Sequence, residues 1–134
     1  MSLAPTGLKA IPSMAKDSGI KALAGCFRIL DMWGASNAQM RRILGAPAER
    51  TFFDWKANRV KRLPEDVMRR IGYVVGIFKA LQIVYSDAQL ADAWVNKPNR
   101  HFGGQTPLER MAAGDVTDLS AVREYLDAAR APWS

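Results

Sequence analysis

The sequence predicts an all-α protein, with an N-terminal bundle that contains a helix-turn-helix and a small helical domain after it. Apolar residues recur at spacings of three and four, the period of a helix that buries one face. Helix-starting and helix-breaking residues separate these segments, and no alternation of apolar and polar residues indicates a strand. Three parts are expected: a flexible arm (1–17), the helix-turn-helix domain with a long core helix (18–85) and a C-terminal domain (86–134).

Seven helices are predicted from capping residues and apolar stripes. They cover residues 20–33, 37–44, 48–57, 64–85, 87–96, 107–113 and 118–130. Ser36, Ser86 and Thr106 are expected N-caps, because their hydroxyl oxygens can accept from free amides of the first turn. Pro107 suits the first helical position after Thr106, and Glu109 completes a capping box with Thr106. The last helix is expected to be capped by Thr117 or Asp118.

The helix over residues 64–85 is expected to be the central core helix. Pro64 opens it, and Glu65 and Asp66 interact well with the helix dipole in its first turn. Little of it is polar, so part of it could also form a dimer face. Its inward residues are expected to be Val67, Ile71, Val74, Val75, Phe78, Leu81 and Ile83. On the next helix, Leu90, Ala91 and Trp94 are expected to face inward.

The charge of the chain is uneven. The 134 residues carry a formal net charge of +6 and have a pI near 9.8, which favours an anionic partner. Residues 41–70 contain nine Lys/Arg and four Asp/Glu, whereas residues 86–134 contain five and seven. A solvated helix face would also explain a basic run, but the asymmetry between the two halves favours a functional interpretation.

The cysteine content and the hydropathy indicate a cytoplasmic protein. Cys26 is the only cysteine, so no disulfide can form within the chain, as expected in a reducing compartment. It lies in an apolar helical context and is interpreted as a small buried hydrophobe. No apolar run approaches the roughly 20 residues of a membrane span. The N-terminal residues lack the apolar centre of a secretory signal.

A helix, a glycine-containing turn and a second short helix around Gly45 predict a helix-turn-helix. The second helix would lie in the major groove of DNA and read it, and neighbouring cations would hold phosphates. The expected reading residues are Arg50, Thr51, Phe53 and Lys56, and the expected phosphate contacts are Arg41, Arg42, Arg59, Lys61 and Arg62. Two features oppose this: Arg41 stands where such units often keep alanine, and Asp54 would repel phosphate.

Enzymatic chemistry is poorly supported, and neither a cofactor nor a metal is expected. His101 is the only histidine, and a zinc site usually needs three or four His or Cys ligands. It is interpreted as a loop residue hydrogen-bonded to the backbone. Gly103-Gly104 indicates a turn rather than a phosphate-binding loop, because no strand precedes it.

The acidic C-terminal half is a candidate protein-binding surface. Trp133 lies beyond the last helix, next to the terminal carboxylate of Ser134. Tryptophan is a frequent anchor in protein interfaces. The alternative is that the tail packs on its own domain or stays disordered.

One stretch resembles the signature of a known family, the Xre/MbcA/ParS-type antitoxins. It contains a tryptophan, a Pro-Asn turn, a Gly-Gly pair and then Thr-Pro-Leu-Glu. The residues are Trp94-Val95-Asn96-Lys97-Pro98-Asn99 and Phe102-Gly103-Gly104-Gln105-Thr106-Pro107-Leu108-Glu109. Gly114, Val122 and Leu126 suit the later part of the signature. The segment Arg50-Thr51-Phe52-Phe53-Asp54-Trp55 resembles the recognition helix of the family's Xre-like N-terminal part. The resemblance covers residues 20–134.

The resemblance implies a type II antitoxin that binds a toxin encoded beside it, usually a RES-type toxin that consumes NAD. Such an antitoxin covers the toxin's active site and represses its own operon, usually as a dimer. The expected toxin contacts are Asp118, Arg123, Glu124, Asp127, Arg130, Trp133 and Ser134. The expected structural supports are Trp94, Asn99, Gly103, Gly104, Thr106, Pro107 and Glu109. Two alternatives remain: a free-standing helix-turn-helix transcriptional regulator whose C-terminal half dimerises, and a helical adaptor without a nucleic-acid role.

Overall fold

The computed structural model describes the backbone of residues 3–130 and the side chains of residues 18–130. Within this part the chain forms seven α-helices and one 3-10 turn, with no strand, so the predicted all-α class is confirmed. The elements are α1 (Leu3–Met32), α2 (Asn37–Ile43), α3 (Glu49–Lys56), α4 (Glu65–Val84), α5 (Ala88–Trp94), η1 (Arg100–Phe102), α6 (Pro107–Met111) and α7 (Val116–Arg130).

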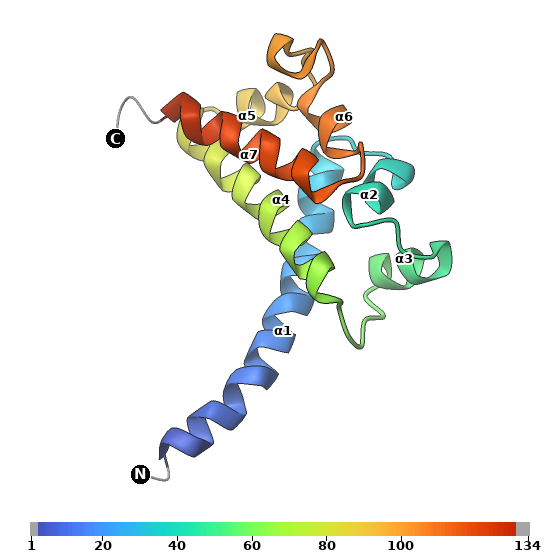
Figure 1. Ribbon diagram of the computed structural model, residues 1–134, viewed down its shortest axis with the longest axis vertical. Coiled ribbons are helices and arrows are strands. Elements are labelled where there is room, and N and C mark those ends of the chain that lie inside the picture. The colour runs from blue at the N-terminus through green and yellow to red at the C-terminus, as the bar shows by residue number, and fades with distance from the viewer. Residues whose placement is uncertain (1–2, 131–134) are drawn as a thin grey trace.

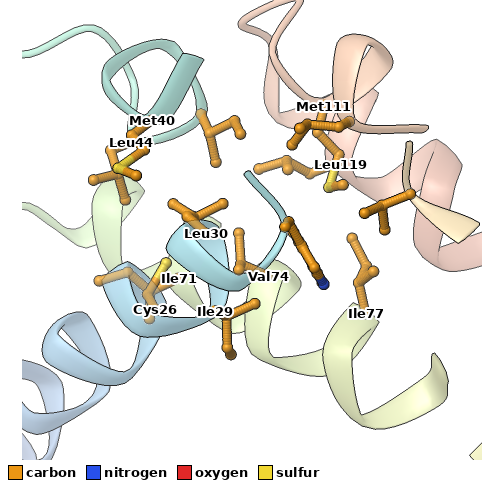
Figure 2. Packing of buried hydrophobic residues seen from close by; sticks show 14 of the residues in the cluster. Cys26, Ile29, Leu30, Met40, Leu44, Ile71, Val74, Ile77, Met111 and Leu119 are labelled. Carbon is orange, nitrogen blue, oxygen red and sulfur yellow. The ribbon is translucent and has the colours of Figure 1, made fainter. Parts of the chain in front are cut away.

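Helix α4 is the centre of the packing, as its apolar sequence predicts. It packs along α7 and against α1, and α2 and α3 lie to one side of this group (Figure 1). One cluster of buried residues joins α1, α2, α4, α6 and α7 (Figure 2). The predicted boundaries at residues 17/18 and 85/86 stay predictions, and the buried cluster runs across the second of them.

Cys26 is fully buried in this core, as expected. Burial raises the pKa of its thiol to about 12, because an apolar environment disfavours the thiolate. The protonated side chain therefore behaves as a small apolar group and is a poor nucleophile.

The first helix begins at Leu3, much earlier than the predicted Ile20. The prolines and glycine of the first residues suggested an arm, because proline in a helix interior loses a hydrogen bond. Extension of an existing helix is favoured because each added residue gains one hydrogen bond while only its own backbone is fixed. The N-terminal half of α1 stands away from the other helices (Figure 1).

Two predicted caps are displaced along the chain. Asp87, not Ser86, caps α5, since its side chain accepts from the Gln89 amide at 2.8 Å. Helix α7 begins at Val116, and the Asp115 side chain accepts from the Thr117 amide at 3.2 Å. A carboxylate at a helix start also interacts favourably with the helix dipole, which a hydroxyl does not do as well. The capping boxes of Ser36 with Gln39 and of Thr106 with Glu109 are both present.

Two residues predicted to face inward are exposed. Ile83 is 64% exposed at the end of α4, and Leu90 is 51% exposed on α5. The helical period continues through both residues, but it carries no information about where the neighbouring helices stop covering a face.

Candidate partner-binding and nucleic-acid interfaces

The loop from Trp94 to Glu109 is held by its own hydrogen bonds. The Asn99 side chain accepts from the His101 amide at 2.9 Å, and the Asn99 amide donates to the Gln105 carbonyl at 3.0 Å. Gly103 and Gly104 have φ values of 66° and 89°, in the left-handed region that favours glycine. These hydrogen bonds and the two glycines give the loop a defined turn.

The end of this loop starts α6 and closes back onto α5. Thr106 and Glu109 each bind the other's backbone amide, at 3.0 and 2.8 Å. Pro107 is the first residue of α6 and is buried. The Leu108 amide donates to the Val95 carbonyl at 3.0 Å. The two ends of the loop are therefore joined directly.

Tyr125 attaches the loop to α7. Its ring stacks on Trp94 with the centroids 5.8 Å apart, and it contacts the rings of His101 at 4.8 Å and Phe102 at 5.5 Å. The His101 side chain was expected to form a hydrogen bond with the backbone. Its imidazole ring instead contacts the rings of Tyr125 and Phe102. These ring contacts thus join the loop to α7, which also packs along α4.

The candidate toxin contacts on α7 form ion pairs with neighbouring side chains. Asp118 pairs with Arg110 of α6 at 2.9 Å, and Arg123 pairs with Asp127 at 3.1 Å. The Arg123 guanidinium lies over Gly76 of α4, where a Cβ atom would collide with it.

The other candidate toxin contacts are partly described. Glu124 is exposed and Arg130 is half-buried. Trp133 and Ser134 lie outside the described residues.

The candidate DNA-contacting residues on α2, on α3 and after α3 differ in their exposure to solvent. Arg50, Lys61 and Arg62 are exposed, Thr51 is half-buried, and Phe53 is 42% exposed although it is a large aromatic residue.

Several of the other candidate cations make intramolecular contacts. Lys56 donates to the Asn37 side chain, and Arg59 pairs with Asp54 at 3.1 Å. The Asp54 carboxylate is thus partly neutralised by its neighbour.

Arg41 and Arg42 donate hydrogen bonds to backbone carbonyls of other segments. Arg41 Nε donates to the Pro47 carbonyl at 2.6 Å and so closes the turn between α2 and α3. This contact explains an arginine at a position where the motif often has alanine. Arg42 donates to the carbonyls of Ala112 at 2.8 Å and Ala113 at 3.1 Å, at the end of α6.

Arg70 of α4 is a further structural arginine, outside the residues predicted to be functional. It is only 8% exposed and pairs with Asp66 at 2.8 Å. Its Nη1 donates to the carbonyls of Ile43 at 3.3 Å and Gly114 at 3.0 Å. The spacing of Asp66 and Arg70, one helical turn apart, was the available signal. Arg42 and Arg70 together tie α2 to the turn between α6 and α7.

Neither a metal site nor a membrane span is found in the described part of the chain. No three His, Cys, Asp or Glu side chains among residues 18–130 gather where they could hold a metal ion. No described helix has the length and apolar character needed to cross a membrane.

Comparison with known proteins identifies the family. Residues 80–131 match the family described as antitoxin Xre/MbcA/ParS C-terminal toxin-binding domain. The chain is 40% identical over 108 residues to the uncharacterized protein y4oB of Sinorhizobium fredii (strain NBRC 101917 / NGR234), and this alignment covers 81% of the chain and 83% of the relative. The match to the toxin-binding domain begins near the end of α4 and includes the loop from Trp94 to Glu109 (the signature loop), α6 and α7. The chain therefore belongs to the antitoxin family that is defined by the Xre/MbcA/ParS C-terminal toxin-binding domain.

Proposed function

We propose that this chain is a type II antitoxin that neutralises a RES-type, NAD-degrading toxin by covering its active site, and that it represses its own operon as a dimer. The match of residues 80–131 to a toxin-binding domain carries the first part of this proposal. The loop in this region is fixed by capping bonds and by Tyr125. A surface that is already ordered loses little conformational entropy on binding, which favours tight association.

Neutralisation requires no catalysis by the antitoxin. It needs buried area and a few anchoring side chains. A toxin that binds the anionic NAD should have a positive cleft, and the segment 86–134 has an excess of acidic residues. Asp118 and Asp127 are paired with arginines, so the exposed carboxylate of Glu124 is the better candidate on α7.

Expression of the toxin from the neighbouring reading frame, with and without this chain, tests the first part. We expect the tagged chain to copurify with the toxin and to stop its NAD consumption. Removal of residues 132–134 then tests the C-terminal tail as a toxin contact, and the change Glu124→Gln tests α7. Unchanged inhibition after the truncation would exclude a role for the tail and leave α7 as the inhibiting element.

The second part of the proposal is operator binding through α2, the following turn and α3. Arg50, Thr51, Phe53 and Lys56 would face the major groove, where Phe53 can contact a thymine methyl group. Arg59, Lys61 and Arg62 would contact phosphates. Arg41 and Arg42 would act mainly by fixing the position of α2, since both side chains bind backbone carbonyls.

Binding to the DNA upstream of the chain's own reading frame, measured at several salt concentrations, tests this second part. The logarithm of the affinity should fall linearly with the logarithm of the salt concentration. Arg50→Ala should weaken binding and reduce sequence preference, whereas Lys61→Ala should weaken binding equally to all sequences. A free-standing regulator would bind this DNA without copurifying with a toxin, and a helical adaptor would not bind it.

A further inference from the structure

Three exposed apolar residues flank the short connection between α4 and α5. The large apolar side chains that are exposed in the described part of the chain are Met32, Phe53, Met68, Ile83, Val84 and Leu90. Ile83, Val84 and Leu90 are 64%, 38% and 51% exposed and fall within eight consecutive residues. Single exposed apolar residues are ordinary, but a group of them marks an interaction surface.

The local structure presents these three side chains on one short unit, which is called the apolar edge below. Ile83 and Val84 are the last two residues of α4, and Leu90 is in the first turn of α5. Only residues 85–87 separate the two helices, and the Asp87 cap fixes where α5 begins. The C-terminal ends of α4 and α7 lie on the same side of the molecule, away from α2 and α3 (Figure 1).

The family match separates the apolar edge from the other exposed apolar residues. Residues 80–131 include the last turn of α4 and all of α5, but not the earlier part of α4. Met32, Phe53 and Met68 lie outside the matched region, whereas Ile83, Val84 and Leu90 lie inside it. Within the toxin-binding domain, the exposed large apolar surface is therefore concentrated at this edge.

The surroundings of the apolar edge resemble those of a protein interface. Gln82, Asp87 and Gln89, which are next to these residues in the sequence, are exposed. An apolar centre with a polar rim is the usual organisation of a protein–protein contact. The branched aliphatic side chains of Ile83, Val84 and Leu90 at such a centre require an apolar depression on the partner, and a cation at the rim of that depression would match Asp87.

We propose that Ile83, Val84 and Leu90 form a docking edge that inserts into an apolar depression on the cognate toxin, as a contact additional to α7 and the tail. This proposal rests on the proposed antitoxin function. It gives the toxin-binding domain two contacts of different chemistry: an apolar anchor at the α4–α5 junction and a charged segment on α7. The apolar contact supplies affinity that changes little with salt concentration, because no charged group takes part in the burial of apolar surface.

The test uses the full chain and the toxin encoded by the neighbouring reading frame. Ile83→Glu and Leu90→Glu introduce a charge at the apolar edge, and Met32→Glu does so at an exposed residue of α1 outside the toxin-binding domain. Circular dichroism and thermal unfolding check that each variant folds. Ile83→Ser gives a smaller change if a glutamate variant does not fold. We expect both edge variants to weaken toxin binding by about tenfold or more, and Met32→Glu to leave it unchanged.

The outcomes separate this inference from the proposed function. If the unaltered chain binds the toxin and the folded edge variants bind it equally well, the apolar edge is not a toxin contact, and the antitoxin function stands. If the edge variants instead lose self-association in analytical ultracentrifugation while toxin binding is kept, the edge belongs to a dimer interface and the inference is wrong. If the unaltered chain binds no toxin, the proposed function fails and the inference fails with it.

Discussion

Arg42 donates a hydrogen bond from Nε to the carbonyl oxygen of Ala112 at 2.8 Å, across 70 positions of sequence. A second bond to Ala113, and the bonds from Arg70 to Ile43 and Gly114, join the same two regions. These contacts link α2, in the proposed DNA-binding unit, to the turn before α7, in the toxin-binding domain. A shift of either region would therefore strain the other.

Loss of the Arg42 contacts should destabilise the fold. Arg42→Ala removes two charge-assisted hydrogen bonds at a partly exposed site, so we expect the free energy of unfolding to fall by about 1–2 kcal/mol. Arg50→Ala is the matched control, because Arg50 is exposed on α3, and its effect should stay within about 0.5 kcal/mol. Urea unfolding measures both variants. Equal effects would mean that the Arg42 contacts do not contribute to stability.

Two glycines of α4 provide a matched test of the contact between α4 and α7. A Cβ atom at Gly72 meets nothing within 4 Å, so Gly72→Ala should stabilise the helix by about 0.5–1 kcal/mol. A Cβ atom at Gly76 displaces Arg123, so Gly76→Ala should lose much of that gain. The difference between their urea midpoints measures the cost of moving Arg123. Similar midpoints would show that Arg123 moves away without loss.

Tyr125 should be required for docking of the signature loop on α7. Tyr125→Ala removes ring contacts with Trp94, His101 and Phe102, and we expect a loss of about 2 kcal/mol, because the side chain is only half-buried. Tyr125→Phe keeps the ring and should change stability by no more than about 0.5 kcal/mol. Thermal unfolding distinguishes the two. A large effect of the phenylalanine variant would instead assign the stabilisation to the hydroxyl group.

The buried thiol of Cys26 predicts a loss of stability at alkaline pH. Its pKa is about 12 in the folded protein and near 9.0 in the unfolded chain, so above pH 9 the unfolded state releases a proton that the folded state keeps. Cys26 should therefore lower the free energy of unfolding by up to about 1.4 kcal/mol per pH unit between these two values. The slope should be smaller in Cys26→Ala, where the other ionisable groups are unchanged. Identical slopes would contradict the burial of the thiol.

The sequence predicted features that depend on neighbouring residues in the chain. The Ser36 cap and the Thr106–Glu109 capping box are confirmed, because each depends only on a cap residue and residues within the next three positions. The caps of α5 and α7 were displaced because several candidate residues stand side by side there. The prediction that Ile83 and Leu90 face the core is wrong, because the helical spacing of apolar residues continues beyond the part of each helix that its neighbours cover.

Features that depend on distant residues could not be predicted in the same way. Nothing local indicates that Arg42 reaches Ala112 or that Arg70 reaches Gly114, because both contacts require the folded arrangement of α2, α4 and α6. The same holds for the stacking of Trp94 on Tyr125. The sequence predicts local features such as caps, and the folded arrangement of the helices determines which distant residues come into contact.

The most direct test of the central claim is the rate of NAD consumption by the toxin from the neighbouring reading frame, measured with purified components as this chain is added. If the chain covers the toxin's active site, the rate falls towards zero as the chain reaches a fixed ratio to the toxin, and the two proteins then elute as one complex. An unchanged rate with excess folded chain, and separate elution of the two proteins, would contradict it.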